Sequence, residues 1–284
     1  MRGDTEGAGG WLDRAALKLH GAGVETPRRD ATLLLAGALG EDKGGVLAHP
    51  ERTLTSIELA KAEGMLGRRL RREPLQYILG FQEFWGLPVR VGPGCLIPRP
   101  ETEHLVESAL RLLRDTEAPA LCEVGTGSGC VLLALATHRP DARLAGIERE
   151  AQALRWSALN LAACANVLLL RGDLEHAPPL RNLHAVLSNP PYITDQEWEE
   201  LEPEVRDFEP PAALRCEDHA LGPYRALARW ASEALRPGGF LLCELGTAQA
   251  RRASALRRIH PALAWREGVR DLAGHLRVAI WEKK

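Results

Sequence analysis

The sequence predicts an α/β fold, in which helices cover both faces of a mostly parallel sheet, with a small helical domain in front of it. From about residue 105, short apolar runs alternate with segments of helix length, the pattern of parallel strands joined by helices. Before residue 73 the pattern is helical and contains no strand-like run. We therefore expect a helical domain over 1–72, a linker with a β-hairpin over 73–104 and the α/β domain over 105–284.

The first domain carries signals for three or four short helices. "WLDRAALKLHGAG" has helical spacing and stops at glycines. "TPRRDATLLLAGALG" has Thr26 as a candidate N-cap, Pro27 at the first helical position and Gly40 just past the end. In "TSIELAKAEGMLGRRLRR", Glu58 stands three residues after Thr55, which is the spacing of a capping box.

Charge gives no sign of a polyanionic partner. The last of these segments ends in Arg68, Arg69, Arg71 and Arg72, a short run among acids that we interpret as a solvated helix end. The net charge is −2, and no apolar run approaches the ~18 residues of a membrane span. We expect neither direct nucleic-acid binding nor membrane association.

The six cysteines are scattered, with no Cys-x-x-Cys pair and no Cys/His cluster of zinc spacing. They predict reduced core thiols in a cytoplasmic protein, and no metal site. In the linker, prolines, glycines and the alternation of Leu87, Val89 and Val91 predict a hairpin followed by extended chain.

Five apolar runs of the last domain are expected to be strands: "ALCEV", "ARLAGIE", "NVLLL", "HAVLSN" and "GFLLCEL". The first is followed by "GTGSG", where Gly125, Gly127 and Gly129 allow backbone to approach a ligand as a strand turns into a helix. The spacing differs from the G-x-G-x-x-G of dinucleotide enzymes, and glycines at strand ends also serve tight packing.

Two acids strengthen the ligand interpretation. Glu148 ends the second strand, 19 residues after Gly129, where an acid can accept both hydroxyls of a ribose. By itself Glu148 reads as a solvated strand end. Asp173 follows the third strand and can accept a hydrogen bond from an adenine amino group. Three consecutive strand ends of this chemistry favour an adenosine-containing cofactor.

The fourth strand leads into "SNPPYI". Asn189 is expected to emerge beside the glycine loop, at the carboxyl ends of the strands where open α/β sheets bind ligands. The Asn189 side-chain oxygen and the Pro190 carbonyl form a rigid pair of acceptors, and Tyr192 a flat wall. Such a site suits a planar –NH2 group, which has two hydrogens to donate. A stiff turn capped by Asn189 is the structural alternative.

"NPPY" together with "EVGTGSG" resembles the class I S-adenosylmethionine-dependent methyltransferases that act on planar amino or amide nitrogens. The wider set is similar to the bacterial protein-(glutamine-N5) methyltransferases that modify peptide chain release factors: "EPLQYILG", "FWGLPVRVGPGCLIPRPETE", "VLSNPPYI", "VRDFEPPAAL", "LRPGGFLLCELGTAQ" and "VRDLAGHLRVA". The resemblance is strong from about residue 70 to the end. It implies a Rossmann-like, mostly parallel seven-stranded sheet and a class 1 release factor, methylated at the glutamine of its Gly-Gly-Gln loop, as partner.

The resemblance also implies roles for individual residues. Catalysis falls to Asn189, Pro190 and Tyr192, and substrate binding to these three residues together with Pro191. The cofactor would lie on Gly125, Thr126, Gly127, Ser128, Gly129, Glu148, Asp173, Leu174 and Asn189. Arg99 and Glu101 either cover the cofactor or form a salt-bridged hinge, and Glu123 either positions the cofactor's amino group or pairs within the sheet. His104, His138 and His184 form no cluster and read as ordinary polar residues.

Several alternatives stay open. A paralogue of this family methylates a glutamine of a ribosomal protein, but Pro98–Glu103 in the linker favour the release-factor enzyme. DNA adenine methyltransferases use a similar "NPPY" for a flipped base, whereas this chain has no basic DNA-reading module. A scaffold that binds cofactor without catalysis is the third alternative. After "EPPAAL" the chain departs from the family, with "RCEDHALGPYR" where a glycine-rich stretch is common.

Overall fold

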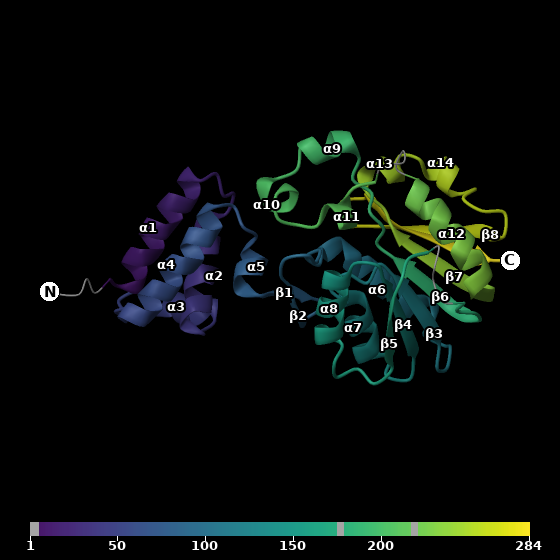
Figure 1. Ribbon diagram of the computed structural model, residues 1–284, viewed down its shortest axis with the longest axis horizontal. Helices are drawn as coiled ribbons and strands as arrows, with labels where there is room; N and C mark the ends of the chain where they lie inside the picture. Colours follow the sequence, from purple (N-terminus) through teal and green to yellow (C-terminus); the bar gives the residue numbers. More distant parts are fainter. Residues whose placement is uncertain (1–5, 175–178, 217–220) are drawn as a thin grey trace. The chain divides into compact units, whose positions relative to one another are not determined.

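The structure, a computed structural model, describes residues 6–174, 179–216 and 221–284. The chain forms two compact units (Figure 1). One contains Met1–Phe81 together with Glu202–Phe208, and the other contains Gln82–Leu201 and Glu209–Lys284. We call them the helical unit and the sheet unit. The polypeptide therefore passes between the units three times. No pattern in the sequence predicted that the short insertion 202–208 belongs to the helical unit.

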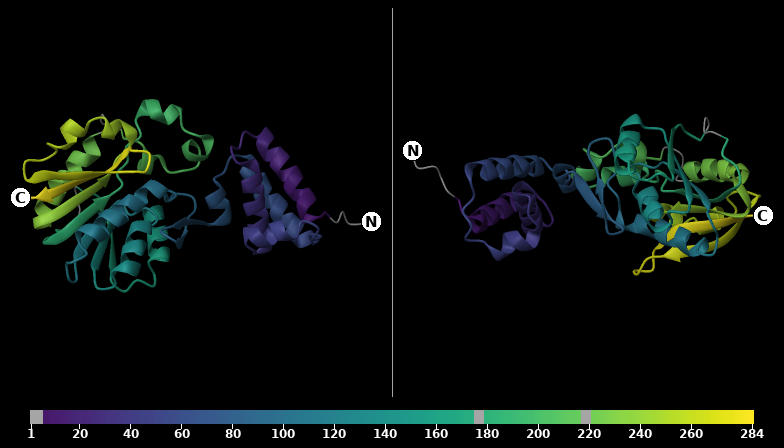
Figure 2. Two further views of the ribbon diagram at one scale, coloured as in Figure 1. Left: turned by 180° about the vertical axis from the view of Figure 1, so that it is seen from behind. Right: turned by 90° about the horizontal axis from the view of Figure 1, so that it is seen from below.

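The helical unit is built from short helices. Its members are α1 (Ala8–Gly21), α2 (Pro27–Leu39), α3 (Lys43–Ala48), α4 (Ser56–Leu70), α5 (Leu75–Leu79) and, from the insertion, α10 (Pro203–Arg206). Helices α1, α2 and α4 pack against one another (Figure 2) around a core that includes the fully buried Trp11, Leu34 and Leu66. The Trp11 indole N–H donates to Glu63 at 2.7 Å, so the one polar atom of this buried side chain has a hydrogen-bond partner.

The helix ends agree with the predicted signals, with one difference. Helix α2 begins at Pro27 and ends before Gly40, which is left-handed with φ of 71°. Thr55 and Glu58 form the predicted capping box of α4. Thr26 precedes α2 as expected but does not cap it with its side chain, because its hydroxyl donates to the carboxylate of Asp30 instead.

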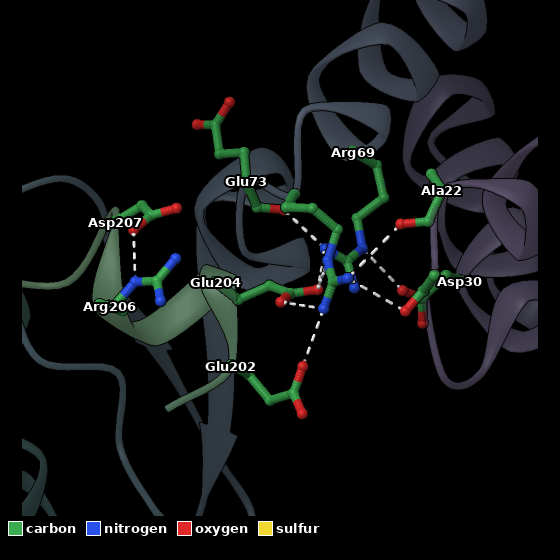
Figure 3. Close-up of polar contacts among 10 residues, drawn as sticks. Ala22, Asp30, Arg69, Glu73, Glu202, Glu204, Arg206 and Asp207 are labelled. Carbon is green, nitrogen blue, oxygen red and sulfur yellow. Dashed lines mark hydrogen bonds and ion pairs between the residues drawn. The ribbon is translucent and has the colours of Figure 1, made fainter. Parts of the chain in front are cut away.

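A group of paired charges, most of them buried or half-buried, joins the insertion to the rest of the helical unit (Figure 3). Arg69 on α4 donates to Asp30 at 2.8 Å and pairs with Glu204 on α10 at 2.8 Å. Arg72 pairs with the same Glu204 at 2.5 Å and with Glu202 at 3.0 Å. Arg69 and Asp30 have side chains only 8% and 6% exposed, so their charges are paired in a place that water hardly reaches. We call these five side chains the ion-pair cluster.

The ion-pair cluster corrects the interpretation of the arginine run. Arg69 and Arg72 are not a solvated helix end: they are the cations of the cluster. Arg68 is also paired, with Glu73 at 2.6 Å. The acids that pair with Arg72 lie 130 and 132 residues further along the chain, where no local pattern could reveal them.

The sheet unit begins with the predicted hairpin, whose two strands are β1 (Phe81–Phe84) and β2 (Leu87–Arg90). A seven-stranded sheet follows, in the order β5-β4-β3-β6-β7-β9-β8. Its strands are β3 (Ala120–Val124), β4 (Arg143–Glu148), β5 (Val167–Arg171), β6 (Leu183–Ser188), β7 (Leu235–Glu244), β8 (Leu263–Arg270) and β9 (Leu276–Lys283). The first five run parallel to one another, and β9 lies antiparallel between β7 and β8. The predicted α/β fold is confirmed.

Helices cover both faces of this sheet. Leu113, Leu121 and Leu135 line a small apolar gap on one face, whereas Tyr224 and Leu227 share a buried core with Cys122 of β3 on the other. The helices of the unit are η1 (Pro100–Thr102), α6 (Glu103–Leu112), α7 (Cys130–His138), α8 (Ala151–Asn160), α9 (Asp195–Glu199), α11 (Pro211–Leu214), α12 (Gly222–Ala234), α13 (Thr247–Ala250) and α14 (Ala253–Leu256). In the described ranges, no helix combines the length and apolar character that crossing a membrane requires.

The order of the strands decides where a ligand can bind. Strand β3 leads to β4 on one side, whereas its other neighbour, β6, leads to β7 on the opposite side, so the connections that leave β3 and β6 run in opposite directions. Open α/β sheets bind ligands at this kind of switch point, beyond the carboxyl ends of the strands. In the present sheet that place is reached by the residues that follow Val124, Glu148 and Ser188.

Candidate active site

The glycine loop connects β3 to α7 and leaves open space beside its backbone. Gly125 and Gly127 have φ of 75° and 55°, in the left-handed region that side chains rarely adopt. A Cβ atom on either glycine would meet nothing within 4 Å, whereas one on Gly129 would press on Ser157 at 3.2 Å. Gly125 and Gly127 therefore face free volume, and Gly129 allows the loop to pack on α8.

Thr126 and Ser128 alternate with these glycines and turn their side chains into the protein, where each is 3% exposed. The Thr126 hydroxyl lies 3.0 Å from that of Ser157 on α8. The Ser128 carbonyl accepts from Asn160 at 2.9 Å. Hydrogen bonds to α8 thus hold the loop in shape and leave mainly its backbone for contact with a ligand.

Glu123, the last residue but one of β3, is buried with one carboxylate oxygen unpaired. Its Oε2 has no hydrogen-bond partner among the described residues, and the residue is 3% exposed. Burial and, secondly, the negative charge of Glu148 raise the pKa of Glu123 well above its ordinary value. An unpaired carboxylate oxygen beside a glycine loop fits a ligand that brings a hydrogen-bond donor or a positive charge.

Glu148 stands at the end of β4, next to the glycine loop, and is 7% exposed. One of its oxygens accepts the N–H of Gly127 and the other the N–H of Glu150, both at 2.9 Å. It is therefore not a solvated strand end. Each carboxylate oxygen can accept a further hydrogen bond, which is what a pair of neighbouring hydroxyls requires.

Asp173 and Leu174 follow β5, the next strand outward. Asp173 is half-buried, and Leu174 packs on the apolar core. The residues directly after them, 175–178, lie outside the described residues, as do 217–220 of the segment in which the chain departs from the family it resembles.

Asn189 comes directly beside the glycine loop, as predicted. Ser188 pairs with Val124 in the parallel register of β6 and β3, so Asn189 and Gly125 are the next residues of neighbouring strands. The Ser188 hydroxyl donates to the Val124 carbonyl at 2.8 Å and ties the two strand ends together. Pro190 is buried, and Asn189, Pro191 and Tyr192 are half-buried.

Two residues that the sequence did not single out hold the side chains of this segment. The Asn189 Nδ2 donates to the Thr102 hydroxyl at 3.3 Å, and that hydroxyl donates to Glu244 Oε2 at 2.6 Å. The Tyr192 hydroxyl lies 3.4 Å from the other oxygen of Glu244. Thr102 and Glu244 are 4% and 1% exposed. Both enter the site only through folding, since they lie 142 residues apart.

The segment around Tyr192 is fixed from two further sides. Its carbonyl accepts from Gln249 Nε2 at 3.0 Å. Gly246 lies so close beneath the ring that a Cβ atom there would come within 2.5 Å of Tyr192 Cδ2. Ile193 pairs through its backbone with Leu214 and Cys216. The "NPPY" segment is therefore held by β7, α13 and the stretch around α11, and its shape does not depend on a capped turn.

Glu244 carries an unusual charge state for a carboxylate. Burial raises the pKa of Glu244 to about 7 and the negative charge of Glu101 adds to this, while hydrogen bonds from Thr102 and Tyr192 and the charge of Arg277 lower it. Near neutral pH this carboxyl group is therefore divided between its ionised and protonated forms.

Arg99 and Glu101 both have protein partners. Arg99 pairs with the buried Glu209, which also accepts the N–H of Ile97 at 3.0 Å. Glu101 lies 3.7 Å from Arg277. These ion pairs favour the salt-bridged hinge, and cover of a cofactor by either residue stays a prediction. Throughout the described ranges, no His, Cys, Asp and Glu side chains gather into a group that could hold a metal ion.

Both parts of the chain match known protein families. Residues 10–80 match the family described as PrmC N-terminal domain, and residues 105–202 match the methyltransferase small domain. The chain is 43% identical over 229 residues to the release factor glutamine methyltransferase of Geobacter sulfurreducens, covering 80% of each chain. It is 36% identical over 275 residues to the release factor glutamine methyltransferase of Escherichia coli K12, covering 95% of this chain and 96% of that protein.

Proposed function

The chain belongs to the family of release factor glutamine methyltransferases, and we propose that it methylates the glutamine of the Gly-Gly-Gln loop in class 1 peptide chain release factors. The methyl group comes from S-adenosylmethionine and goes to the side-chain amide nitrogen. The observation that carries the proposal is the register of β3 and β6, which sets Asn189 beside the glycine loop. Because the substrate works in translation, we place the reaction in the cytoplasm.

The residues around the glycine loop fit S-adenosylmethionine, which supplies an electrophilic methyl group on a positively charged sulfonium. Glu123, with its unpaired Oε2, would accept from the amino group of the methionine part. Gly125 and Gly127 give the space for close backbone approach. Glu148 would accept the two ribose hydroxyls, while Asp173 and Leu174 would border the adenine.

Asn189, Pro190 and Tyr192 would hold the glutamine amide. An amide nitrogen is a poor nucleophile, since its lone pair is delocalised into the carbonyl. Hydrogen bonds from its two hydrogens to Asn189 Oδ1 and the Pro190 carbonyl would fix the amide plane and aim the face of the nitrogen at the methyl group. Orientation of this kind contributes ~7–11 kcal/mol in favourable intramolecular reactions.

The same acceptors stabilise the positive charge that develops on the nitrogen. Two dipoles fixed before the reaction stabilise a growing positive charge without reorganising. The nitrogen becomes strongly acidic as it is methylated, so its proton can leave late and no histidine or carboxylate base is required. The absence of a basic side chain from the proposed catalytic set, Asn189, Pro190 and Tyr192, is consistent with this course.

Mass spectrometry of release factors tests the proposal. Purified class 1 release factor, incubated with the protein and isotopically labelled S-adenosylmethionine, is expected to gain one labelled methyl group on the loop glutamine. Release factor whose loop glutamine is replaced by alanine is the control and should gain none. Transfer instead to a ribosomal protein, or to adenine in DNA, would overturn the assignment of substrate. Binding of the cofactor without transfer to any of the three would support the non-catalytic scaffold.

Replacement of Glu148 by alanine should weaken cofactor binding and spare the chemical step. A contact with the ribose is the same before and during transfer, so it stabilises ground state and transition state equally. Loss of a buried, charged hydrogen-bonding group costs ~1–3 kcal/mol, or roughly 5- to 150-fold in affinity. Calorimetry with Glu148→Ala measures the affinity for S-adenosylmethionine, and kcat at saturating cofactor measures the chemical step. Glu150→Ala, an exposed neighbour, is the matched control; equal affinity in both variants would remove Glu148 from the site.

We assign substrate recognition to the helical unit. Asn189, Pro190 and Tyr192, which we call the amide clamp, would accept almost any glutamine. Selectivity for one protein loop must therefore come from contacts elsewhere. The helical unit exposes apolar side chains that its own core leaves uncovered, among them Leu17 at 73% and Ile57 at 81%. Deleting residues 1–72 would strip Glu204 of Arg69 and Arg72. For this reason the full-length chain is the better test object.

The double variant Leu17→Gln and Ile57→Gln should therefore raise the KM for intact release factor and leave kcat unchanged. A loss of about tenfold in kcat/KM corresponds to ~1.4 kcal/mol of docking energy. The control is Leu168→Gln, which changes a side chain 56% exposed on β5 of the sheet unit. Steady-state kinetics with intact release factor decides, and equal KM values in the double variant and the control contradict recognition through these side chains.

A further inference from the structure

The proposed clamp works in only one of two orientations of the Asn189 side chain. The two ends of an amide group have nearly the same size, but one is an acceptor and the other carries two N–H donors. If the group were turned by half a rotation, Nδ2 would meet the hydrogens of the substrate amide, donor against donor. Something in the fold must therefore select the orientation in which Oδ1 points to the substrate.

We propose that Thr102 and Glu244 are positioning residues for methyl transfer, which hold Asn189 with Nδ2 turned inward and Oδ1 toward the substrate nitrogen. This inference rests on the proposed function. Its basis is the chain of hydrogen bonds from Asn189 Nδ2 to the Thr102 hydroxyl at 3.3 Å and on to Glu244 Oε2 at 2.6 Å.

The number of hydrogens makes this chain directional. An ionised carboxylate only accepts hydrogen bonds, so the hydrogen between Thr102 and Glu244 must come from the threonine. A hydroxyl group has one hydrogen. Because the hydrogen of Thr102 is already bonded to Glu244, the Thr102 oxygen can only accept a further hydrogen bond. Of the two ends of Asn189, only Nδ2 can donate to it. The charge on Glu244 thereby decides which way an amide two hydrogen bonds away must face.

The surroundings keep the chain intact. Thr102 and Glu244 are almost fully buried, so water does not compete for their hydrogen bonds. Cys243, the neighbour of Glu244 on β7, pairs with Ser188, the neighbour of Asn189 on β6, and this fixes the two strand ends relative to each other. The other oxygen of Glu244 faces the Tyr192 hydroxyl at 3.4 Å. The Glu244 carboxylate thus faces Tyr192, the wall of the clamp, directly and holds Asn189, its acceptor, through Thr102.

Protonation of Glu244 would reverse the direction. A protonated carboxyl on Oε2 donates to Thr102, whose hydroxyl hydrogen is then free to donate to Asn189 Oδ1, and the amide turns around. Burial is the largest cause that raises the pKa of Glu244 to about 7; of the charged groups that face Glu244, Glu101 adds to this rise and Arg277 opposes it. The ionised form is the competent one, so kcat is expected to fall as the pH drops through about 7 and to be constant well above it.

Kinetics separate positioning from simple structural support. Thr102→Val keeps the shape but removes the hydroxyl, and should lower kcat by up to about 100-fold with unchanged KM for release factor, since misorientation affects the step and not docking. Thr102→Ser should restore most of the rate. Glu244→Gln should slow the enzyme and remove the fall in kcat near pH 7. Thr137→Val, a similar change at an exposed helix position, is the matched control and should leave kcat unchanged.

A spectroscopic measurement tests the same inference without turnover. The side-chain NH2 resonance of Asn189, assigned by its loss in Asn189→Ala, should shift with a midpoint near pH 7 in the unaltered protein. The shift should be absent from Glu244→Gln and from Thr102→Val. A shift that persists in both variants, or full kcat in Thr102→Val, overturns the positioning role. If the unaltered protein fails to methylate release factor while the shift behaves as expected, the proposed function fails and the coupling of Glu244 to Asn189 stands.

Discussion

Replacement of Asn189 by alanine is expected to lower methyl transfer by roughly 1000-fold while cofactor binding and folding persist. The variant loses one of the two proposed acceptors for the substrate amide, a loss of ~1–3 kcal/mol, and the misplaced nitrogen adds up to about 100-fold. Asn189 lies at the end of β6, half-buried, so truncation of its side chain removes no core packing. Single-turnover transfer to release factor measures the loss, and calorimetry with S-adenosylmethionine measures what is retained.

The opposite end of the same strand provides the control. Asn182 precedes β6, is exposed and has a left-handed φ of 59°, which glycine adopts without strain. Asn182→Gly therefore deletes an asparagine side chain next to the same strand and should methylate at the full rate. Transfer by Asn189→Ala at a rate close to that of Asn182→Gly would contradict the amide clamp.

The second large effect concerns stability. Arg69→Ala should lower the free energy of unfolding of the helical unit by ~3–5 kcal/mol, because removing one partner of a buried ion pair leaves its counter-charges uncompensated. Here the side chain of Asp30, which is 6% exposed, would lose its cation, and that of Glu204, which is 16% exposed, would keep only Arg72 of its two cations. Urea unfolding monitored by circular dichroism gives the free energy.

Arg28→Ala is the matched control for this measurement. Arg28 pairs with Asp13, but the two side chains are 53% and 77% exposed, and an exposed pair contributes ~0–1 kcal/mol. If Arg69→Ala and Arg28→Ala proved equally stable, the ion-pair cluster would not hold the helical unit together.

The sequence predicted the elements whose signals are local. The limits of α2, the capping box of α4 and the five parallel strands follow from caps, turn residues and apolar runs within a few residues of one another. The antiparallel strands β8 and β9 were not identified as separate runs. Strand β8 alternates half-buried and exposed residues and carries Arg266, Glu267 and Arg270, so it lacks the continuous apolar run of a strand buried on both faces.

Site residues divide in the same way. Gly125, Glu148 and Asn189 could be found because each directly follows or ends an apolar run, and the parallel sheet brings such ends together. Thr102 could not, since its partners Asn189 and Glu244 lie 87 and 142 residues away. A hydrogen bond between residues so distant in the chain leaves no periodicity or spacing in the sequence. The pairing of Arg69 and Arg72 with acids escaped prediction for the same reason.

The insertion 202–208 has a consequence for the order in which the protein forms during synthesis. Helices α1 to α5 leave the ribosome first, but Glu204, which pairs with Arg72, is made 132 residues later. At ~5–20 residues per second this is a delay of roughly 7–26 s, during which the nascent helical unit lacks part of its ion-pair cluster. Its last stabilising contacts form only after most of the parallel strands have emerged. A chimaera that exchanges this unit between relatives must therefore transplant residues 202–208 together with 1–81.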